Sequence, residues 1–314
     1  MSKLRIVFMG TPFFALPALR LLCENEYTPV AVYTQPDKVN GRGGRVSFSP
    51  VKTYALDAGI PVYQPVSFKA SEAIEKLADL APDLIVVIAY GQILPQNVLD
   101  LPRYGAVNIH ASLLPRYRGA APVQRAIIDR EPATGVTIMK LDAGMDTGDM
   151  ILQEKILLDD QVTAGELLET LGEMGARALI RILPNLQEAL AGAVPQQESL
   201  ATYAAKLTKE MGHIHWEKSA VDLHALARGM YPNPGTYTMF RGKRIKLHET
   251  VLSHCMVSDA APGEICSIEG GILYVATGEG ILGITLLQPE NKKRMKAADF
   301  INGFQVKVHD RFED

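Results

Sequence analysis

The sequence predicts an α/β protein with two domains: an N-terminal, doubly wound, mostly parallel sheet that is Rossmann-like, and a C-terminal OB-like β-barrel. Three observations predict this fold class. The chain has 314 residues, which is more than one hydrophobic core usually holds. Its first half alternates short apolar runs with helical patterns, as parallel sheets do. Its last third carries short strand-like runs separated by Gly and Pro, as in small barrels.

Buried strands and helices alternate through residues 1–190, the predicted first domain. The run Leu4–Met9 ends at Gly10, and Leu84–Ala89 is the clearest buried strand of all. Continuous apolar runs of this kind are typical of strands covered on both faces. Further strands are expected at Val30–Thr34, Ala106–His110 and Gly135–Leu141, and helices at Ala15–Glu24, Pro122–Asp129 and Ala164–Leu190. The last helix should kink or split near Pro184.

Residues 191–206 are small and polar and include a proline, so they are predicted to link the two domains. The second domain, residues 207–314, begins with a predicted helix at Ser219–Met230. Its expected strands are Thr236–Phe240, Ile245–Thr250, Gly263–Ile268, Ile272–Ala276 and Ile281–Gln288. Five short strands with turn signals between them favour a barrel of OB-like size.

Composition excludes several classes of protein. A net charge of −3 argues against a polycation that coats nucleic acid, although local basic clusters remain. No apolar run approaches the roughly 18 residues that cross a membrane, and the first apolar run is too short for a signal peptide. The three cysteines form no CxxC pair. A cytoplasmic protein without a membrane partner is therefore expected.

Asn108, His110 and Asp146 are the strongest candidates for catalysis. Asn108 and His110 lie two residues apart where a predicted strand ends, so their side chains share one face. Ligands of doubly wound sheets bind at this end of the strands. Asp146 follows in the turn-rich run Asp142–Asp149. An amide that polarises a carbonyl, an imidazole that stabilises an oxyanion and a carboxylate that orients it or accepts a proton together suit acyl transfer to an amine.

Three other motifs point away from alternative chemistries. Gly10-Thr11-Pro12 follows the first strand but lacks the glycines of a dinucleotide cradle, which argues against NAD. Ser112 is not in a GxSxG elbow, which argues against a serine hydrolase. His213 and His215 could share one strand face, but no third ligand stands at a suitable spacing, so no metal is expected.

Basic residues gather in a loop of the first domain and in two clusters of the second. The loop Gln35–Lys52 has three glycines and no acidic residue beyond Asp37. It is either a solvated surface loop or a basic finger that orders on a phosphate-rich partner. The basic residues of interest are Lys38, Arg42 and Arg45 in this loop, Lys206 and Lys209 beside the linker, Arg241, Lys243 and Arg244 in an expected hairpin, and Lys292 and Lys293 in a later loop. Clusters on a barrel favour binding to an RNA backbone.

On these residues, the chain resembles the methionyl-tRNA formyltransferase family over its whole length. The resemblance rests on Asn108–Gln124, Gly135–Ile138, Asp142–Asp149, the loop Gln35–Gly43 and Ala276–Gly278. The Asn, His and Asp pattern resembles every folate-dependent formyltransferase, whereas the basic loop and the barrel domain single out the tRNA enzymes. One departure is Tyr231–Tyr237, where such proteins often carry a tryptophan.

The resemblance implies 10-formyltetrahydrofolate as the formyl donor and the amino group of initiator methionyl-tRNA as the acceptor. It implies that Asn108, His110 and Asp146 are catalytic, with Asp146 as a proton acceptor or as an orienter of His110. It implies that the folate contacts Ser112, Leu113, Leu114 and Pro115. It also implies that Arg42 lies in a loop that approaches the acceptor stem, with the other basic residues above as further tRNA contacts. A monomer is expected.

Three alternatives remain open at this point. A formyltetrahydrofolate hydrolase would use water in place of the amine, and a nucleotide-sugar formyltransferase would use another amine. Neither needs the basic loop. A non-catalytic OB-type RNA-binding protein would have no need of Asn108, His110 and Asp146 together. Formyl transfer from added folate would separate these alternatives.

Overall fold

The computed structural model describes residues 4–40, 45–253 and 259–314. The chain divides into two compact units. The first comprises residues 1–122, 134–156 and 168–204, and the second comprises residues 123–133, 157–167 and 205–314. Among the described residues, no helix has the length and apolar character needed to cross a membrane.

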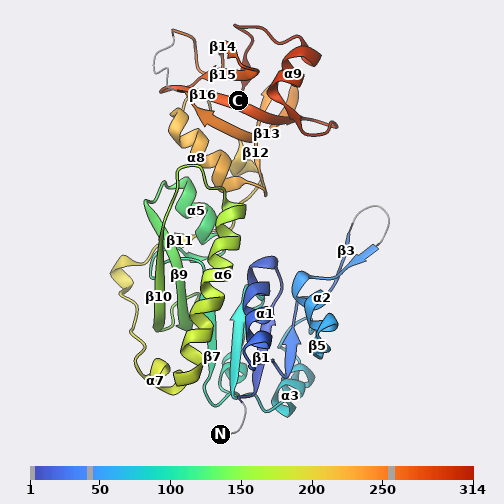
Figure 1. The fold of residues 1–314 in the computed structure, drawn as a ribbon, viewed down its shortest axis with the longest axis vertical. Helices are drawn as coiled ribbons and strands as arrows, with labels where there is room; N and C mark the ends of the chain where they lie inside the picture. Colours follow the sequence, from blue (N-terminus) through green and yellow to red (C-terminus); the bar gives the residue numbers. More distant parts are fainter. Residues whose placement is uncertain (1–3, 41–44, 254–258) are drawn as a thin grey trace. The chain divides into compact units, whose positions relative to one another are not determined.

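The first unit is built on a seven-stranded sheet with the order β10-β9-β7-β6-β1-β2-β5 (Figure 1). These strands are β1 (Ile6–Gly10), β2 (Ala31–Tyr33), β5 (Val62–Tyr63), β6 (Leu84–Ile88), β7 (Ala106–His110), β9 (Ala133–Lys140) and β10 (Met150–Leu157). The pairs β1–β2, β1–β6, β2–β5 and β6–β7 are parallel, while β9 runs antiparallel to β7. The prediction of a mostly parallel, doubly wound sheet is therefore confirmed.

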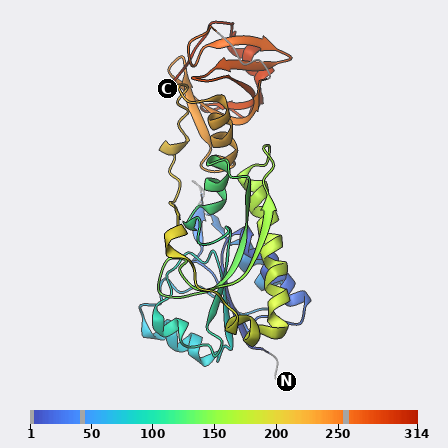
Figure 2. The same cartoon turned by 90° about the vertical axis from the view of Figure 1, so that its left-hand side faces the viewer.

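Helices cover both faces of this sheet (Figure 2). They are α1 (Leu16–Glu24), α2 (Pro50–Asp57), α3 (Ser71–Asp79), α4 (Gln96–Leu99) and α6 (Ala164–Ile182). One core joins α1, α2 and α6 to strand residues such as Phe8 and Val86. The other joins α3 and α4 to Met9 and Val87 on the opposite face. Successive strand residues thus alternate between two cores, which explains why the central strands β1 and β6 are apolar throughout.

The long helix predicted at 164–190 is split at the expected place. The helix α6 ends at Ile182, a 3-10 turn (η2, Leu183–Asn185) contains Pro184, and α7 (Leu186–Ala191) follows. Proline has no backbone N–H and clashes with the preceding turn, so it ends the first helix. The strand β10 was not predicted, because its side chains are only half-buried or exposed and give no apolar run.

Two short strand pairs accompany the sheet. A two-stranded pair joins β8 (Arg118–Gly119), which follows the end of β7, to β11 (Tyr203–Ala204) in parallel. A hairpin formed by β3 (Lys38–Asn40) and β4 (Arg45–Ser47) lies within the predicted basic loop. Residues 191–204 are thus part of the first compact unit.

The second unit is a curled antiparallel sheet with the order β14-β15-β16-β13-β12-β18, with β17 beside β16. Its strands are β12 (Thr236–Phe240), β13 (Lys243–Leu252), β14 (Ile265–Glu269), β15 (Ile272–Ala276), β16 (Ile281–Pro289), β17 (Met295–Lys296) and β18 (Phe312–Glu313). A bridge between Glu264 and Arg311 joins the two ends of the sheet. This closure confirms the predicted OB-like barrel.

The barrel core is closed by two helices and one tryptophan. The helix α8 (Ala220–Met230) begins at Ser219, whose hydroxyl accepts a hydrogen bond from the Asp222 amide as an N-cap. A second helix, α9 (Ala297–Phe304), was not predicted and places Phe300 in the core. Trp216 is buried beside them and stacks on Phe312. The short helix α5 (Pro122–Ile128) packs against α8 at Gly229.

Candidate active site

The site lies where the central strands of the first unit end. The sheet order reverses between β1 and β6, and their carboxyl ends meet at the pair Gly10 and Ile88. A Cβ on residue 10 would lie 2.9 Å from the Ala15 Cβ and 3.1 Å from the Ile88 carbonyl oxygen, so glycine is needed for this close approach. Such a switch point is where doubly wound sheets bind ligands.

The next strand, β7, supplies the predicted amide and imidazole. Val107 and Ile109 point into the core under α6, so the alternation of the strand sends Asn108 and His110 to the opposite face. The prediction that these two side chains lie on the same face of the strand is therefore confirmed. Both are more than nine-tenths buried. Within the described part of the chain, the Asn108 side-chain amide has no hydrogen-bond partner, which leaves it available to a substrate carbonyl.

His110 is held by a backbone carbonyl and faces a carboxylate. Its Nε2 lies 2.9 Å from the Tyr117 carbonyl oxygen, and its Nδ1 lies 3.6 Å from Asp146 Oδ2. A carbonyl oxygen only accepts, so Nε2 must carry a hydrogen and donate it. Nδ1 is then the nitrogen that faces Asp146 and the site. The structure thus brings Asp146 to the imidazole across 36 residues of chain.

Asp146 sits in a tightly constrained turn. Its Oδ2 accepts a hydrogen bond of 2.7 Å from the Gly119 amide, and its backbone is left-handed with a φ of 55°. Tyr117, whose carbonyl holds His110, is also left-handed with a φ of 59°. Non-glycine residues in this region are strained, and such strain gathers at functional sites. Asp142 stabilises the turn by accepting from the amide of Gly144.

The segment Ser112–Pro115, expected to contact folate, forms a turn beside His110. Ser112 is fully buried and its hydroxyl donates to the Arg116 carbonyl at 2.6 Å, so it builds the turn. Leu114 is also buried, whereas Leu113 and Pro115 are half-buried. The sequence analysis did not identify the residues that hold this turn. Thr137 binds the backbone of residues 112 and 114, and Gln153 donates to the carbonyl of residue 114 at 2.8 Å.

Large apolar side chains are exposed around the same end of the sheet. Phe13 follows β1 and Ile93 follows β6, while Met145, in the turn that holds Asp146, lies 3.7 Å from the position of a Cβ at Gly119. Their exposed fractions are 73%, 87% and 63%. We call these three residues the apolar rim. Exposed apolar groups clustered around a polar site mark a place for an apolar ligand. Each lies in a loop, where no periodic pattern distinguishes it in the sequence.

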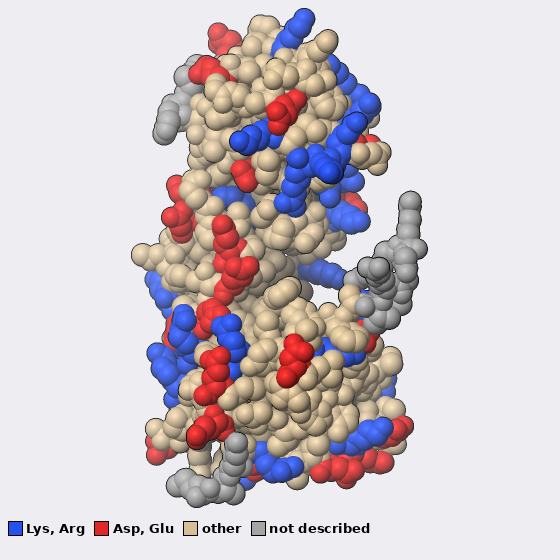
Figure 3. All heavy atoms as spheres, turned by 45° about the vertical axis from the view of Figure 1, so that its right-hand side comes forward, with Lys and Arg blue, Asp and Glu red and all other residues tan. Residues whose placement is uncertain are grey.

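The residues predicted to contact tRNA differ in whether their side chains already make contacts within the protein. Arg42 lies outside the described residues, and Arg45 belongs to β4. The exposed lysines are Lys38, Lys206, Lys209, Lys243, Lys292 and Lys293. Two arginines of the barrel are already engaged: Arg241 pairs with Asp310 at 2.8 Å, and Arg244 lies 3.4 Å from the centre of the Tyr237 ring. Figure 3 shows Lys and Arg side chains gathered on one face of the second unit.

His213 and His215 form an aromatic contact in the second unit. Their rings lie 4.8 Å apart, and His213 also stacks on Tyr237. Burial and the neighbouring His215 lower the pKa of His213. The described residues contain no group of three or more His, Cys, Asp or Glu side chains suited to a metal ion.

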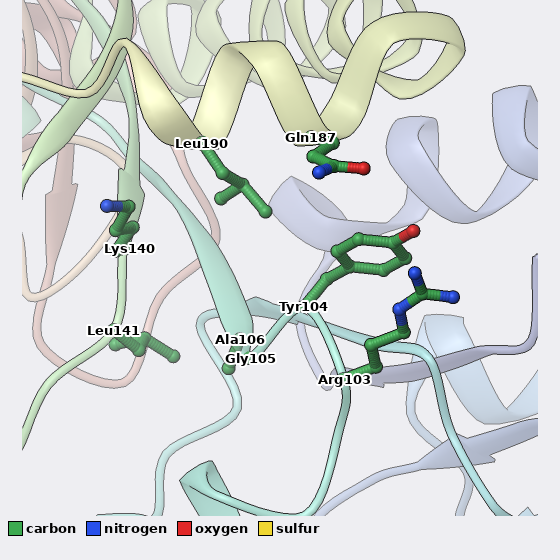
Figure 4. Close-up of a pocket in the computed structure, with 8 residues that line it drawn as sticks. All are labelled: Arg103, Tyr104, Gly105, Ala106, Lys140, Leu141, Gln187 and Leu190. Atoms are coloured by element: carbon green, nitrogen blue, oxygen red, sulfur yellow. The ribbon is translucent and has the colours of Figure 1, made fainter.

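A separate pocket of about 470 Å³ lies at the other end of the first sheet (Figure 4). Arg103, Tyr104, Lys140 and Gln187 line it, together with Ala106 at the start of β7. His110 stands at the opposite end of the same strand. None of the predicted catalytic or folate-binding residues borders this pocket.

Comparisons with known proteins identify the family to which both parts of the chain belong. Residues 4–183 match the family described as "Formyl transferase", and residues 206–305 match "Formyl transferase, C-terminal domain". A methionyl-tRNA formyltransferase of Marinobacter nauticus is 48% identical over 96% of this chain and 96% of its own length. A second, from Alkaliphilus metalliredigens, is 44% identical over 96% of this chain and 95% of its own.

Solved structures share the fold at lower identity. HypX from Aquifex aeolicus, in complex with tetrahydrofolic acid, has a TM-score of 0.66 at 18% identity, covering 100% of this chain and 49% of that one. WlaRD, a sugar 3N-formyl transferase solved with dTDP and 5-N-formyl-THF, has a TM-score of 0.67 at 17% identity, covering 93% and 100%. The full-length identity to curated relatives decides the assignment. This chain belongs to the methionyl-tRNA formyltransferase family.

Proposed function

We propose that this protein transfers a formyl group from 10-formyltetrahydrofolate to the free amino group of initiator methionyl-tRNA. The observation that carries the proposal is the placement of Asn108 and His110 on one strand face, with the Asp146 carboxylate 3.6 Å from the imidazole. The relatives' names supply the acceptor, since both are methionyl-tRNA formyltransferases. The same site in a sugar formyltransferase or a hydrolase would not need the basic residues of the barrel.

The three side chains divide the work of formyl transfer. The acceptor amine must be neutral to attack, and α-amino groups titrate near pH ~8. As its nitrogen bonds to the formyl carbon, negative charge grows on the formyl oxygen, where the Asn108 amide can donate a hydrogen bond. His110 Nδ1 is positioned to accept the proton that the amine loses, and Asp146 then stabilises the imidazolium. When the bond from the formyl carbon to folate N10 breaks, that proton passes to N10.

Binding of the two substrates falls to different surfaces. The apolar rim, together with the half-buried Leu113 and Pro115 of the turn that follows His110, would offer the flat folate ring apolar contacts. The exposed lysines, with Arg42 and Arg45 of the basic loop, would contact tRNA phosphates. Phosphate contacts position a nucleic acid and make binding salt-dependent.

The proposal also covers the domain boundaries, the oligomeric state and the cellular location of the protein. The catalytic domain would span residues 1–190, the linker residues 191–206 and the tRNA-binding barrel residues 207–314. The protein would act as a monomer in the cytoplasm. Light scattering of the purified protein tests the monomer directly, since a mass near twice 34.3 kDa would contradict it.

The decisive experiment incubates the protein with 10-formyltetrahydrofolate and charged initiator tRNA, and separates methionyl-tRNA from formylmethionyl-tRNA on acid gels. Asn108→Ala and His110→Ala should each lower turnover by about 10²- to 10³-fold, because each removes a group that acts on the transition state. His309→Ala, at an exposed histidine of the second unit, serves as the matched control and should retain activity. Release of tetrahydrofolate without formylated tRNA would instead establish a hydrolase.

A further inference from the structure

The segment predicted as a linker reaches into the catalytic turn through one side chain. The Gln196 Nε2 donates hydrogen bonds of 2.8 Å to the carbonyls of both Asp146 and Gly148. Its Oε1 accepts a hydrogen bond of 3.0 Å from Arg118 Nε. Carbonyls only accept and guanidinium groups only donate, so the amide can be oriented in one way only. Both of its hydrogens and its oxygen are used.

The partner of Gln196 is itself firmly fixed. Arg118 is only 1% exposed, and its two terminal nitrogens lie 3.1 Å and 2.9 Å from the Glu198 carboxylate. Its backbone belongs to β8, which pairs with β11 at Tyr203. The linker is therefore held at residues 196, 198 and 203 against the chain that follows His110. Bidentate pairs of this kind fix geometry as well as charge.

Gln196 and Gly119 hold different parts of the same aspartate. The Gly119 amide binds the Asp146 carboxylate, while Gln196 binds the backbone carbonyl of Asp146 and that of the residue two further on. The left-handed φ of 55° at Asp146 is disfavoured for a side-chain-bearing residue, so the turn needs outside support. Hydrogen bonds to the side chain of Asp146 and to the backbone of the turn provide that support.

We propose that Gln196 is a positioning residue for formyl transfer, which keeps Asp146 within reach of His110 Nδ1. The inference rests on the proposed catalytic role of Asp146. Gln196 acts through the turn and not on the substrate. Reacting groups misplaced by about 1 Å can lose a factor of about 10² in rate, so support of the turn should appear in kcat.

Two substitutions at position 196 test this against a purely structural role. Gln196→Ala removes both bonds to the turn and should lower kcat by about 10- to 100-fold, with KM unchanged for folate and for tRNA. Gln197→Ala, at the exposed neighbour, is the matched control and should behave as wild type. Gln196→Glu retains an oxygen for Arg118 but directs a second oxygen at two carbonyls, so kcat should fall at least as far. Wild-type kcat in Gln196→Glu would show that only the Arg118 contact matters and would overturn the proposal.

A double-mutant cycle with Asp146→Asn completes the test under single-turnover conditions. If Gln196 acts through Asp146, adding Gln196→Ala to Asp146→Asn should cause no further loss of rate. Losses that multiply in the double variant would overturn the inference and leave the role of Asp146 intact. Asp146→Asn with wild-type turnover would overturn the proposed catalytic role itself, so the two failures are distinguishable. Far-ultraviolet circular dichroism checks that each variant is folded.

Discussion

Replacing the buried His224 should flatten the acid dependence of the stability of the second unit. His224 lies on α8 and is 2% exposed, with its Nδ1 2.8 Å from the Thr250 hydroxyl. Burial, with a smaller contribution from the nearby Arg228 cation, lowers the pKa of His224 from 6.5 to about 4. The neutral imidazole is therefore the form that the folded barrel accommodates.

The size of the effect follows from proton linkage. Below pH 6.5 the unfolded chain binds a proton at this histidine, while the folded chain does not until about pH 4. The free energy of unfolding therefore falls as the pH drops through this window. Between pH 7 and pH 5 the loss from this one group is about 2 kcal/mol, and it approaches about 3 kcal/mol near pH 4.

The fluorescence of a single tryptophan can be used to follow unfolding of the second unit. Trp216 is the single tryptophan and is buried in the barrel, where its Nε1 donates to the Thr238 hydroxyl at 3.0 Å. Its fluorescence during guanidinium unfolding therefore reports on this unit. His224→Asn keeps a polar partner for Thr250 but cannot titrate. Wild type should lose about 2 kcal/mol more than the variant between pH 7 and pH 5, and equal losses would refute the reasoning.

Three further predictions concern activity and tRNA binding. A Cβ at Gly148 would overlap the Lys140 carbonyl oxygen, so Gly148→Ala should displace the catalytic turn and lower kcat at least about tenfold. Gly303→Ala, where the new Cβ meets open space, should leave kcat unchanged, and steady-state kinetics of the two variants test this prediction. Lys243→Ala should raise KM for tRNA without moving Tm. Arg244→Ala should also lower the stability of the barrel by about 1 kcal/mol, because its guanidinium covers an aromatic ring, and thermal melts would separate the two. Raising the salt concentration should weaken tRNA binding much more than folate binding, and a tRNA KM that ignores salt would rule out the phosphate contacts.

The sequence predicted those features of the site that depend on residues close together in the chain, and it carries no local signal for those that join distant residues. The shared face of Asn108 and His110 follows from the period of a single strand. The nearness of Asp146 to His110 does not, because it depends on how a turn 36 residues further along the chain folds back onto the strand. Gln196 contacts residues 50 and 78 positions away along the chain. Its own segment, small and polar, gives no local signal beyond that of a linker.

Among the helices and strands, too, those with a clear local residue pattern were predicted, and those that depend on tertiary contacts were missed. Strands buried on both faces, such as β1 and β6, are apolar throughout and were predicted within a residue or two. The edge strand β10 is partly exposed along its length and shows no such run. The helix α9 follows a basic loop and contains Asn302 and Gly303, which are poor helix formers. Its helical state depends on burying Phe300 in the barrel, a tertiary contact that propensity does not register.

The bridge between Glu264 and Arg311 has a consequence for how the barrel is made. The strand β18 at Phe312 pairs with β12, and the segment just before it meets the start of β14. The strands β12 to β16 can pair with one another before β18 docks, but the ring stays open until residues 311–313 join it. Until then β12 and β14 present unpaired edges, which are templates for aggregation. Docking of β18 therefore removes both of these aggregation-prone edges in one step.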